Sequence, residues 1–360
     1  MKILVLANID VGLYRFRREL LSRLLEEHKV TISLPDGDLV RPLEEMGCTF
    51  VHTPVERRGM NPAKDFRLFL RYLALIRREK PELVITYTIK PNVYGGLACR
   101  LMGVPYAANV TGLGTAFQKS GGLKTLVTTL YRWALKRAKT VFFENAENRQ
   151  TLLDERIVRE AQCVLLPGAG VNLNNFSPAP YPEDDGPTRF LFMGRVMAEK
   201  GVDELFAAVE RLNRSGTACT LDVLGFCEED YEEKIRAGER AGWLRYHGYQ
   251  TNVTPFIAAA HCFVLPSWHE GMANTNLECA AMARPVITSR IPGCMEAVDE
   301  GSSGFLCEVR NIDSLCAAMD QFCHLPRDAR EKMGLAGRAR MERLFDKRIV
   351  VEQTVSALGL

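Results

Sequence analysis

A glycine and two cations lie in a loop that follows an apolar run in the second half of the chain. Residues 192–201 read FMGRVMAEKG, with Arg195 and Lys200 five positions apart. Glycine lets a phosphate approach the backbone, and the amino end of the helix expected next offers unpaired N–H groups. With two cations added, Gly194, Arg195 and Lys200 could bind a diphosphate. The alternative is a solvated loop whose cations face water.

Two carboxylates occur in a later loop of the same half. Residues 266–278 read PSWHEGMANTNLE, so seven residues separate Glu270 from Glu278. If a helix begins near Ala273, Glu278 lies on its second turn and Glu270 lies in the loop before it, and the two acids serve different tasks. A carboxylate that accepts two hydroxyls suits a ribose, and one beside exposed N–H groups suits a hexose. The alternative is one acid favoured near a helix amino end and one solvated acid.

Short β-branched runs alternate with longer amphipathic stretches along the whole chain. We expect strands at 3–7, 29–33, 49–52, 83–88, 106–110 and 141–144, and again at 189–193, 219–224, 244–247, 262–265, 285–288 and 304–306. This alternation predicts α/β domains with doubly wound parallel sheets, one over 1–165 and one over 166–345. Residues 346–360 are expected to form a helix that crosses back to the first domain. Ligands of such sheets bind outside the carboxyl ends of the strands, so the site is expected in a cleft between the domains.

The two loops, in this order and domain, resemble those of glycosyltransferase family 4. The resemblance implies the GT-B fold, in which two Rossmann-like domains bind the acceptor and the nucleotide-sugar donor. It implies catalytic roles for Arg195 and Lys200 on the donor diphosphate and for Glu270 beside the donor sugar, with Glu278 on the ribose. The donor contacts that it implies are Gly12, Gly194, Gly271, Met272, Ala273, Asn274 and Glu278. Residues 167–172 (PGAGVN) and 291–296 (IPGCME) support it.

The first half resembles one branch of that family in residues 86–96 and 109–115. That branch adds N-acetylhexosamines to polyprenyl-diphosphate-linked acceptors in bacterial glycan assembly. Many members carry a histidine near the end of the second of these strands, where this chain has Thr111 and Gly112. A histidine-assisted mechanism is therefore not expected. His269 either reaches the sugar or only shapes its loop.

Residues 83–143 contain no Asp or Glu. An amphipathic helix is expected around residues 123–135, and it could rest on anionic lipid, each cation adding about 1 kcal/mol. Alternatively, its apolar stripe packs on its own sheet and its cations are solvated. The cations expected to contact the acceptor or the membrane are Lys90, Lys119, Lys124, Arg132, Lys136, Arg137 and Lys139. A second basic cluster, which includes Arg67 and Arg71, could receive an acceptor diphosphate.

The composition limits the class of protein. With 47% apolar residues, 25% charged residues and a net charge of +2, the chain reads as globular and not as a nucleic-acid binder. Eleven cysteines without a Cys-x-x-Cys pair predict neither a disulfide framework nor a zinc site. No metal or cofactor is expected beyond the nucleotide-sugar substrate. The first apolar run is too short for a signal peptide, and no run is long enough to span a bilayer, so we expect a cytoplasmic protein that can contact the inner face of the cell membrane.

The resemblance implies a retaining, metal-independent transfer of an N-acetylhexosamine from a UDP donor to a polyprenyl-diphosphate-linked saccharide. Two other functions remain open. A nucleotide-sugar epimerase of the same architecture would need no acceptor, and a noncatalytic relative would only bind the nucleotide sugar.

Overall fold

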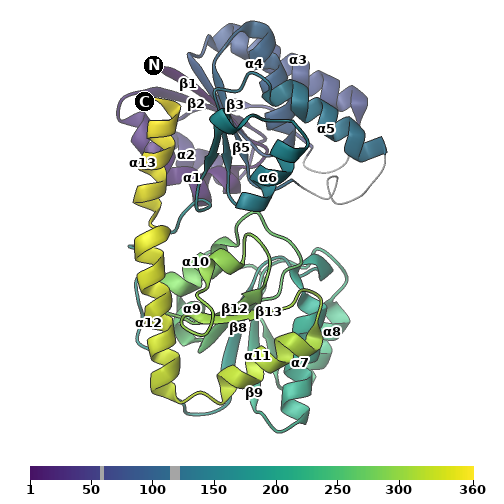
Figure 1. Ribbon diagram of the computed structural model, residues 1–360, viewed down its shortest axis with the longest axis vertical. Coiled ribbons are helices and arrows are strands. Elements are labelled where there is room, and N and C mark those ends of the chain that lie inside the picture. The colour runs from purple at the N-terminus through teal and green to yellow at the C-terminus, as the bar shows by residue number, and fades with distance from the viewer. Residues whose placement is uncertain (57–60, 114–121) are drawn as a thin grey trace. The chain divides into compact units, whose positions relative to one another are not determined.

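The computed structural model describes residues 1–56, 61–113 and 122–360. The chain divides into two compact units (Figure 1). The first unit contains Met1–Ala169 and Lys347–Leu360, and the second contains Gly170–Asp346. The boundary between the two units, at Ala169 and Gly170, therefore lies a few residues beyond the boundary expected at residue 165.

The first unit is built on a seven-stranded parallel sheet. Its strand order is β3-β2-β1-β4-β5-β6-β7, so the winding direction reverses between β1 and β4. β1, β4 and β5 are buried almost throughout, because these apolar strands are covered on both faces. The strands are β1 Lys2–Leu6, β2 Lys29–Leu34, β3 Thr49–His52, β4 Leu83–Tyr87, β5 Tyr106–Val110, β6 Thr140–Phe143 and β7 Cys163–Leu165. Sequence reasoning missed β7, a three-residue edge strand without a fully buried residue.

Helices cover both faces of this sheet and form one apolar core on each face. The helix α13 packs beside α1 in the first unit (Figure 1). Its buried residues Val350, Val355 and Leu358 join the core on the α1 side. The helices are α1 Asp10–Leu25, α2 Val40–Glu45, α3 Pro62–Glu79, α4 Gly96–Met102, α5 Gly122–Leu135, α6 Ala146–Asp154 and α13 Lys347–Leu358, with a π-helical turn at Pro91–Gly95 and a 3-10 turn at Glu160–Gln162.

The second unit repeats this architecture with six parallel strands in the order β10-β9-β8-β11-β12-β13. The winding direction reverses between β8 and β11, which places the loops after these two strands side by side. The strands are β8 Thr188–Met193, β9 Cys219–Leu224, β10 Leu244–Tyr246, β11 Cys262–Leu265, β12 Val286–Ser289 and β13 Gly304–Cys307. The helices are α7 Val202–Arg214, α8 Glu232–Arg240, α9 Thr254–Ala259, α10 Asn274–Ala281, α11 Ile312–Cys323 and α12 Arg327–Leu344, with 3-10 turns at Ala198–Lys200 and Met295–Ala297.

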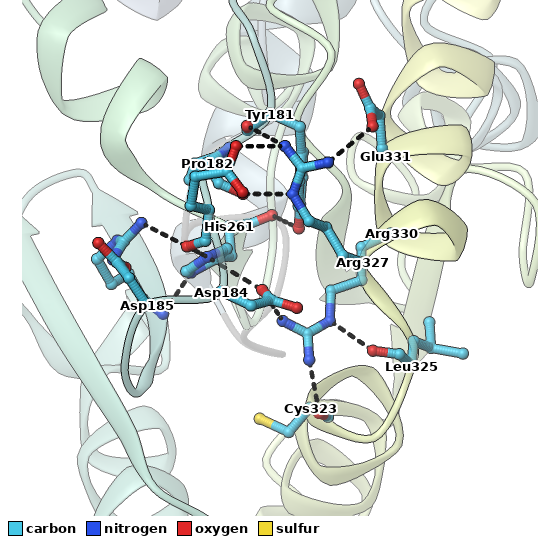
Figure 2. A network of polar contacts seen from close by, with 12 residues as sticks. Tyr181, Pro182, Asp184, Asp185, His261, Cys323, Leu325, Arg327, Arg330 and Glu331 are labelled. Atoms are coloured by element: carbon cyan, nitrogen blue, oxygen red, sulfur yellow. Dashed lines mark hydrogen bonds and ion pairs between the residues drawn. The ribbon is translucent and has the colours of Figure 1, made fainter.

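Residues 178–187 of the second unit are held against the rest of that unit by a polar network (Figure 2). Arg327 Nη2 donates to the carbonyl of Tyr181 at 3.1 Å, and Arg330 Nη1 lies 3.2 Å from Asp184 Oδ1. The His261 ring is buried behind them. Its Nδ1 accepts the N–H of Arg189 at 2.9 Å, which leaves the ring proton on Nε2.

Candidate functional site

The carboxyl edge of the second sheet gathers four loops, those after β8, β9, β11 and β12. Because the strands are parallel, these loops leave the sheet at the same edge. Backbone hydrogen bonds join the loops to one another. The N–H of Val196 donates to Phe226 at 2.8 Å, that of Trp268 to Glu199 at 3.0 Å, and that of Ala273 to Gly293 at 2.7 Å.

An ion pair between Lys200 and Glu270 lies at the centre of this edge. Lys200 Nζ is 2.5 Å from Glu270 Oε1, and the side chains are 17% and 12% exposed. The hydroxyl of Ser267, which is fully buried, donates to the same oxygen at 2.8 Å. The structure thus brings together two of the three residues for which sequence reasoning expected catalytic roles. It also puts them in direct contact, which their separate roles did not imply.

Gly201 explains how Lys200 reaches Glu270. Gly201 has φ +71°, and a Cβ there would lie 2.1 Å from the carbonyl oxygen of Pro266. A side chain at this position would therefore push the loop after β8 away from the loop after β11. The 3-10 turn at Ala198–Lys200 precedes this glycine, and α7 begins only at Val202. The helix expected directly after the loop therefore starts with this short turn.

Arg195 lies at the same edge but contacts a different acid. Its Nη1 is 3.2 Å from Glu228 Oε2, in the loop after β9. The neighbouring Gly194 packs tightly on that loop, because a Cβ on Gly225 would lie 1.7 Å from the Gly194 carbonyl oxygen. Arg195 is therefore positioned by the β9 loop, which sequence reasoning did not consider.

Residues 271–278 enter α10, as the sequence predicted. Met272 and Ala273 are buried, Asn274 is the first residue of the helix, and Glu278 is half-buried on its second turn. The Oδ1 atom of Asn274 is buried and has no hydrogen-bond partner within the part of the chain that the structure describes. Buried polar atoms are usually satisfied, so this atom is a candidate ligand contact.

The loop after β12 supports the backbone beside Glu270. Gly293 has φ +85°, and a Cβ there would lie 2.7 Å from the carbonyl oxygens of Glu270 and Gly271. Glu296 Oε2 accepts the Gly293 N–H at 2.7 Å, which fixes this glycine. Burial, followed by the charge of Glu270, raises the pKa of the Cys294 thiol in the same loop. Cys294 is therefore a neutral thiol and not a nucleophile.

Three residues that contact Trp268 and His269 were not identified from the sequence, namely Glu199, Glu204 and Arg310. His269 Nε2 lies 3.5 Å from Glu199 Oε2, and Trp268 Nε1 donates to Glu204 Oε1 at 3.1 Å. The guanidinium of Arg310 lies 3.9 Å from the centre of the Trp268 ring. His269 thus contacts Glu199 at the border of the site. These contacts leave no signal in a local motif, because their partners lie far apart in the sequence.

The carboxyl edge of the first sheet holds Gly12 and a second, unpredicted ion pair. Gly12 lies in the first turn of α1, after the buried Asp10, whose Oδ2 accepts the N–H of Leu39 at 2.8 Å. Arg17 Nη2 is 2.5 Å from Glu144 Oε1, and both side chains are nearly buried. Burial raises the pKa of Glu144, although the Arg17 charge opposes this shift.

Most of the cations expected to meet the acceptor or a membrane contact the protein itself. Lys90 Nζ is 2.7 Å from Asp65 Oδ1, and Lys124 Nζ is 3.0 Å from Glu155 Oε1. Arg132 donates to the Glu155 carbonyl, and Lys139 donates to the Leu358 carbonyl. Lys136 and Arg137 are exposed, and Lys119 lies outside the described residues. The apolar stripe of α5 is divided, since Val127, Tyr131, Ala134 and Leu135 are buried while Leu126 and Trp133 are exposed.

Among the described residues, no group of three or more His, Cys, Asp and Glu side chains is arranged to hold a metal ion. None of the helices in the described ranges has both the length and the apolar character needed to cross a membrane.

Two family models match the chain and together span most of it. The "Glycosyl transferase 4-like domain" matches residues 12–169, and "Glycosyl transferases group 1" matches residues 187–324. The chain is 23% identical to the N,N'-diacetylbacillosaminyl-diphospho-undecaprenol alpha-1,3-N-acetylgalactosaminyltransferase of Campylobacter jejuni, over 98% of this chain and 97% of that protein. It is 25% identical to the UDP-Gal:alpha-D-GlcNAc-diphosphoundecaprenol alpha-1,3-galactosyltransferase of Escherichia coli, over 74% and 72%.

A solved structure shows the same fold over the full length. The Anabaena protein HepE in complex with UDP and glucose is similar with a TM-score of 0.82 and 15% identity, covering 100% of this chain and 99% of that one. The expectation of two Rossmann-like domains of the GT-B type is confirmed.

Proposed function

Because the chain belongs to glycosyltransferase family 4 and has the GT-B fold, we propose that it transfers a sugar from a UDP donor to a polyprenyl-diphosphate-linked saccharide, with no metal and with retention of configuration. The best candidate for the sugar is an N-acetylhexosamine. The acceptor and sugar are suggested by the names of the two relatives, whose acceptors are linked to undecaprenol through a diphosphate. We further propose that the reaction takes place at the cytoplasmic face of the cell membrane, where the enzyme can meet a lipid-linked acceptor.

The Lys200–Glu270 ion pair is the observation that best supports this activity. A donor diphosphate would compete with Glu270 for the Lys200 ammonium. Once released from Lys200, the Glu270 carboxylate can accept a hydrogen bond from a hydroxyl of the donor sugar, while Ser267 holds the carboxylate in its orientation. Arg195 can exchange Glu228 for the same diphosphate. The two cations thus stabilise the charge that grows on the leaving phosphate, each charged hydrogen bond contributing about 1.5 to 3 kcal/mol.

The transfer exchanges one bond of the anomeric carbon for another. The bond from this carbon to the diphosphate oxygen breaks, and the acceptor hydroxyl oxygen bonds to the carbon on the same face. The hydroxyl proton passes to the departing phosphate, so no protein base is needed. The backbone of residues 271–274 supports the donor sugar. The Glu278 carboxylate binds the ribose hydroxyls of the nucleotide.

The decisive experiment incubates the protein with UDP-, GDP- and ADP-sugars, with and without polyprenyl-diphosphate saccharides. Nucleotide release and product mass are followed, and proton NMR of the product reports the anomeric configuration. We expect a lipid-linked product, with the donor's configuration, only when both substrates are present. An isomerised nucleotide sugar in the absence of acceptor would indicate an epimerase, and binding without turnover would indicate a noncatalytic protein.

A further inference from the structure

Helices α3, α4 and α5 of the first unit and the π-helical turn at Pro91–Gly95 line a half-open hollow of about 370 Å³. Figure 1 shows these helices close together in the first unit. The hollow lies within the range of 300–1,000 Å³ typical of small-molecule sites. Its lining is almost entirely apolar and includes Phe66, Phe69, Tyr94, Leu97, Leu126 and Leu130.

The apolar surface continues beyond the hollow. Phe66 at its rim is 59% exposed, although it is a large aromatic side chain. Leu101 lies one helical turn after Leu97 on α4, and Trp133 lies one turn after Leu130 on α5, so each pair shares a helix face. The side chains of Leu101 and Trp133 are 70% and 57% exposed. Arg100 Nη1 donates to the Trp133 carbonyl at 2.9 Å, which joins the ends of these two rows. An exposed apolar surface that leads into a hollow indicates a binding site for an apolar ligand.

The polar groups of the hollow are compensated or neutral. Asp65 lines it and pairs with Lys90, so neither charge is left over. Burial, with a smaller effect of Asp65, raises the pKa of Tyr94 to about 12, which keeps its hydroxyl protonated. An uncharged chain can therefore enter without leaving a charge unpaired.

The hollow also adjoins the carboxyl edge of the first sheet. Lys90, which bonds to Asp65 in the wall of the hollow, follows β4 by three residues. Ligands of doubly wound sheets bind at this edge. On the solvent side of α3, Arg67 and Arg71 are exposed and directly follow the exposed Phe66 and Leu70 in the sequence. The rim thus combines apolar side chains with cations, which complements an anionic lipid surface.

We propose that this hollow binds the isoprenoid chain of a polyprenyl diphosphate, with the diphosphate lying toward the carboxyl edge of the first sheet. The inference rests on the proposed function, which supplies a lipid-linked acceptor. A long apolar chain fits both parts of the surface, since one segment fills the hollow and the next follows the exposed rows of α4 and α5.

The test compares a Phe66→Ser/Leu126→Ser variant with the wild type and with Ile349→Ser. Both altered rim positions are largely exposed, so folding should be retained, and equal melting temperatures would verify this. Ile349 is an exposed apolar residue of the same unit but lies on α13, away from the hollow. Calorimetry measures binding of farnesyl diphosphate and of inorganic diphosphate. We expect the rim variant to bind farnesyl diphosphate at least about ten-fold more weakly, with Ile349→Ser unchanged.

A kinetic measurement separates this inference from the proposed function. With a polyprenyl-linked acceptor, the rim variant should raise KM at least about ten-fold and leave kcat unchanged, whereas a tail-less diphosphate saccharide should show no change. Unchanged affinity for farnesyl diphosphate in the rim variant would overturn the inference. So would equal wild-type affinity for farnesyl diphosphate and inorganic diphosphate. If no acceptor is glycosylated but farnesyl diphosphate binding still depends on the rim, the proposed acceptor is wrong and the isoprenoid site stands.

Discussion

Glu270 and Ser267 share one short loop, and the Ser267 hydroxyl donates to the same carboxylate oxygen that contacts Lys200. Oε1 of Glu270 therefore has two donors, one neutral and one charged. If a ligand withdraws Lys200, Ser267 still orients the carboxylate. This arrangement allows Glu270 to change partners without losing its position.

Loss of either member of the Lys200–Glu270 pair should reduce transfer to a small residual rate. Lys200→Ala removes a cation from the leaving diphosphate, and Glu270→Ala removes the carboxylate beside the sugar, so each should lower kcat at least about 100-fold. Product formation from radiolabelled donor measures this. Arg214→Ala, which breaks the exposed Arg214–Glu210 pair of the second unit, is the control and should keep full activity. Wild-type turnover by either variant would remove its assigned role.

Ser267→Ala should give a smaller loss. The hydroxyl only orients Glu270, and a hydrogen bond to a charged carboxylate contributes at least about 1.5 kcal/mol, so kcat/KM should fall about ten-fold. In a Glu270→Ala background, Ser267→Ala should cause no further loss, because the group that it orients is gone. Equal effects in both backgrounds would show that Ser267 acts independently of Glu270.

The strands were predicted better than the contacts between them. Residues 106–110 and 219–224 coincide with β5 and β9, because apolar, β-branched runs of this length identify buried strands. The strand β7 has three partly exposed residues, so it leaves no such run. Burial pattern is a local property of the sequence, whereas pairing depends on the tertiary fold.

The residues of the site show the same limit, because the sequence locates them but does not reveal which residues they contact. The motifs located Lys200 and Glu270 in the correct loops, but 70 residues separate them and their contact depends on the left-handed Gly201. Lys139 was expected to face lipid, yet it bonds to Leu358, which is 219 residues away. Lys139 lies between α5 and β6, and its partner comes from α13, so this contact cannot be inferred from the local sequence.

Membrane attachment should depend on Lys136 and Arg137 more than on Lys124 or Lys139. The first two are exposed, whereas Lys124 and Lys139 already contact Glu155 and Leu358. Lys136→Glu/Arg137→Glu should weaken sedimentation with anionic vesicles at least about ten-fold, at about 1 kcal/mol for each charge near the surface. Arg214→Glu in the second unit is the matched control. Equal sedimentation of all three proteins would exclude this surface as a membrane contact.

His261 should make the stability of the second unit depend on pH. Burial is the main cause that lowers its pKa, Arg189 and Arg330 lower it further, and the Glu183 carbonyl and Asp184 oppose them. The His261 ring of the unfolded chain therefore binds a proton more readily than that of the folded protein. The contribution of neutral His261 to stability is fully present above the ordinary histidine pKa of about 6.5, and it is lost as the pH falls through the lowered pKa of the folded protein. Urea unfolding from pH 7.5 to 5 should show this slope, and His261→Asn should flatten it. The same slope in both proteins would assign the effect to other groups.

The Arg17–Glu144 pair should contribute more to stability than any exposed pair of the first unit. Glu144→Ala or Arg17→Ala leaves one charge nearly buried without its partner, which should cost about 3 kcal/mol in urea unfolding. Arg17→Met/Glu144→Leu removes both charges and should cost less than either single change. Because burial raises the pKa of Glu144, the folded state takes up a proton on this carboxylate at a higher pH than the unfolded chain does. The Arg17→Ala variant should therefore regain stability as the pH falls below the raised pKa of Glu144. Additive losses in the double variant, or no recovery at low pH, would contradict a buried, coupled pair.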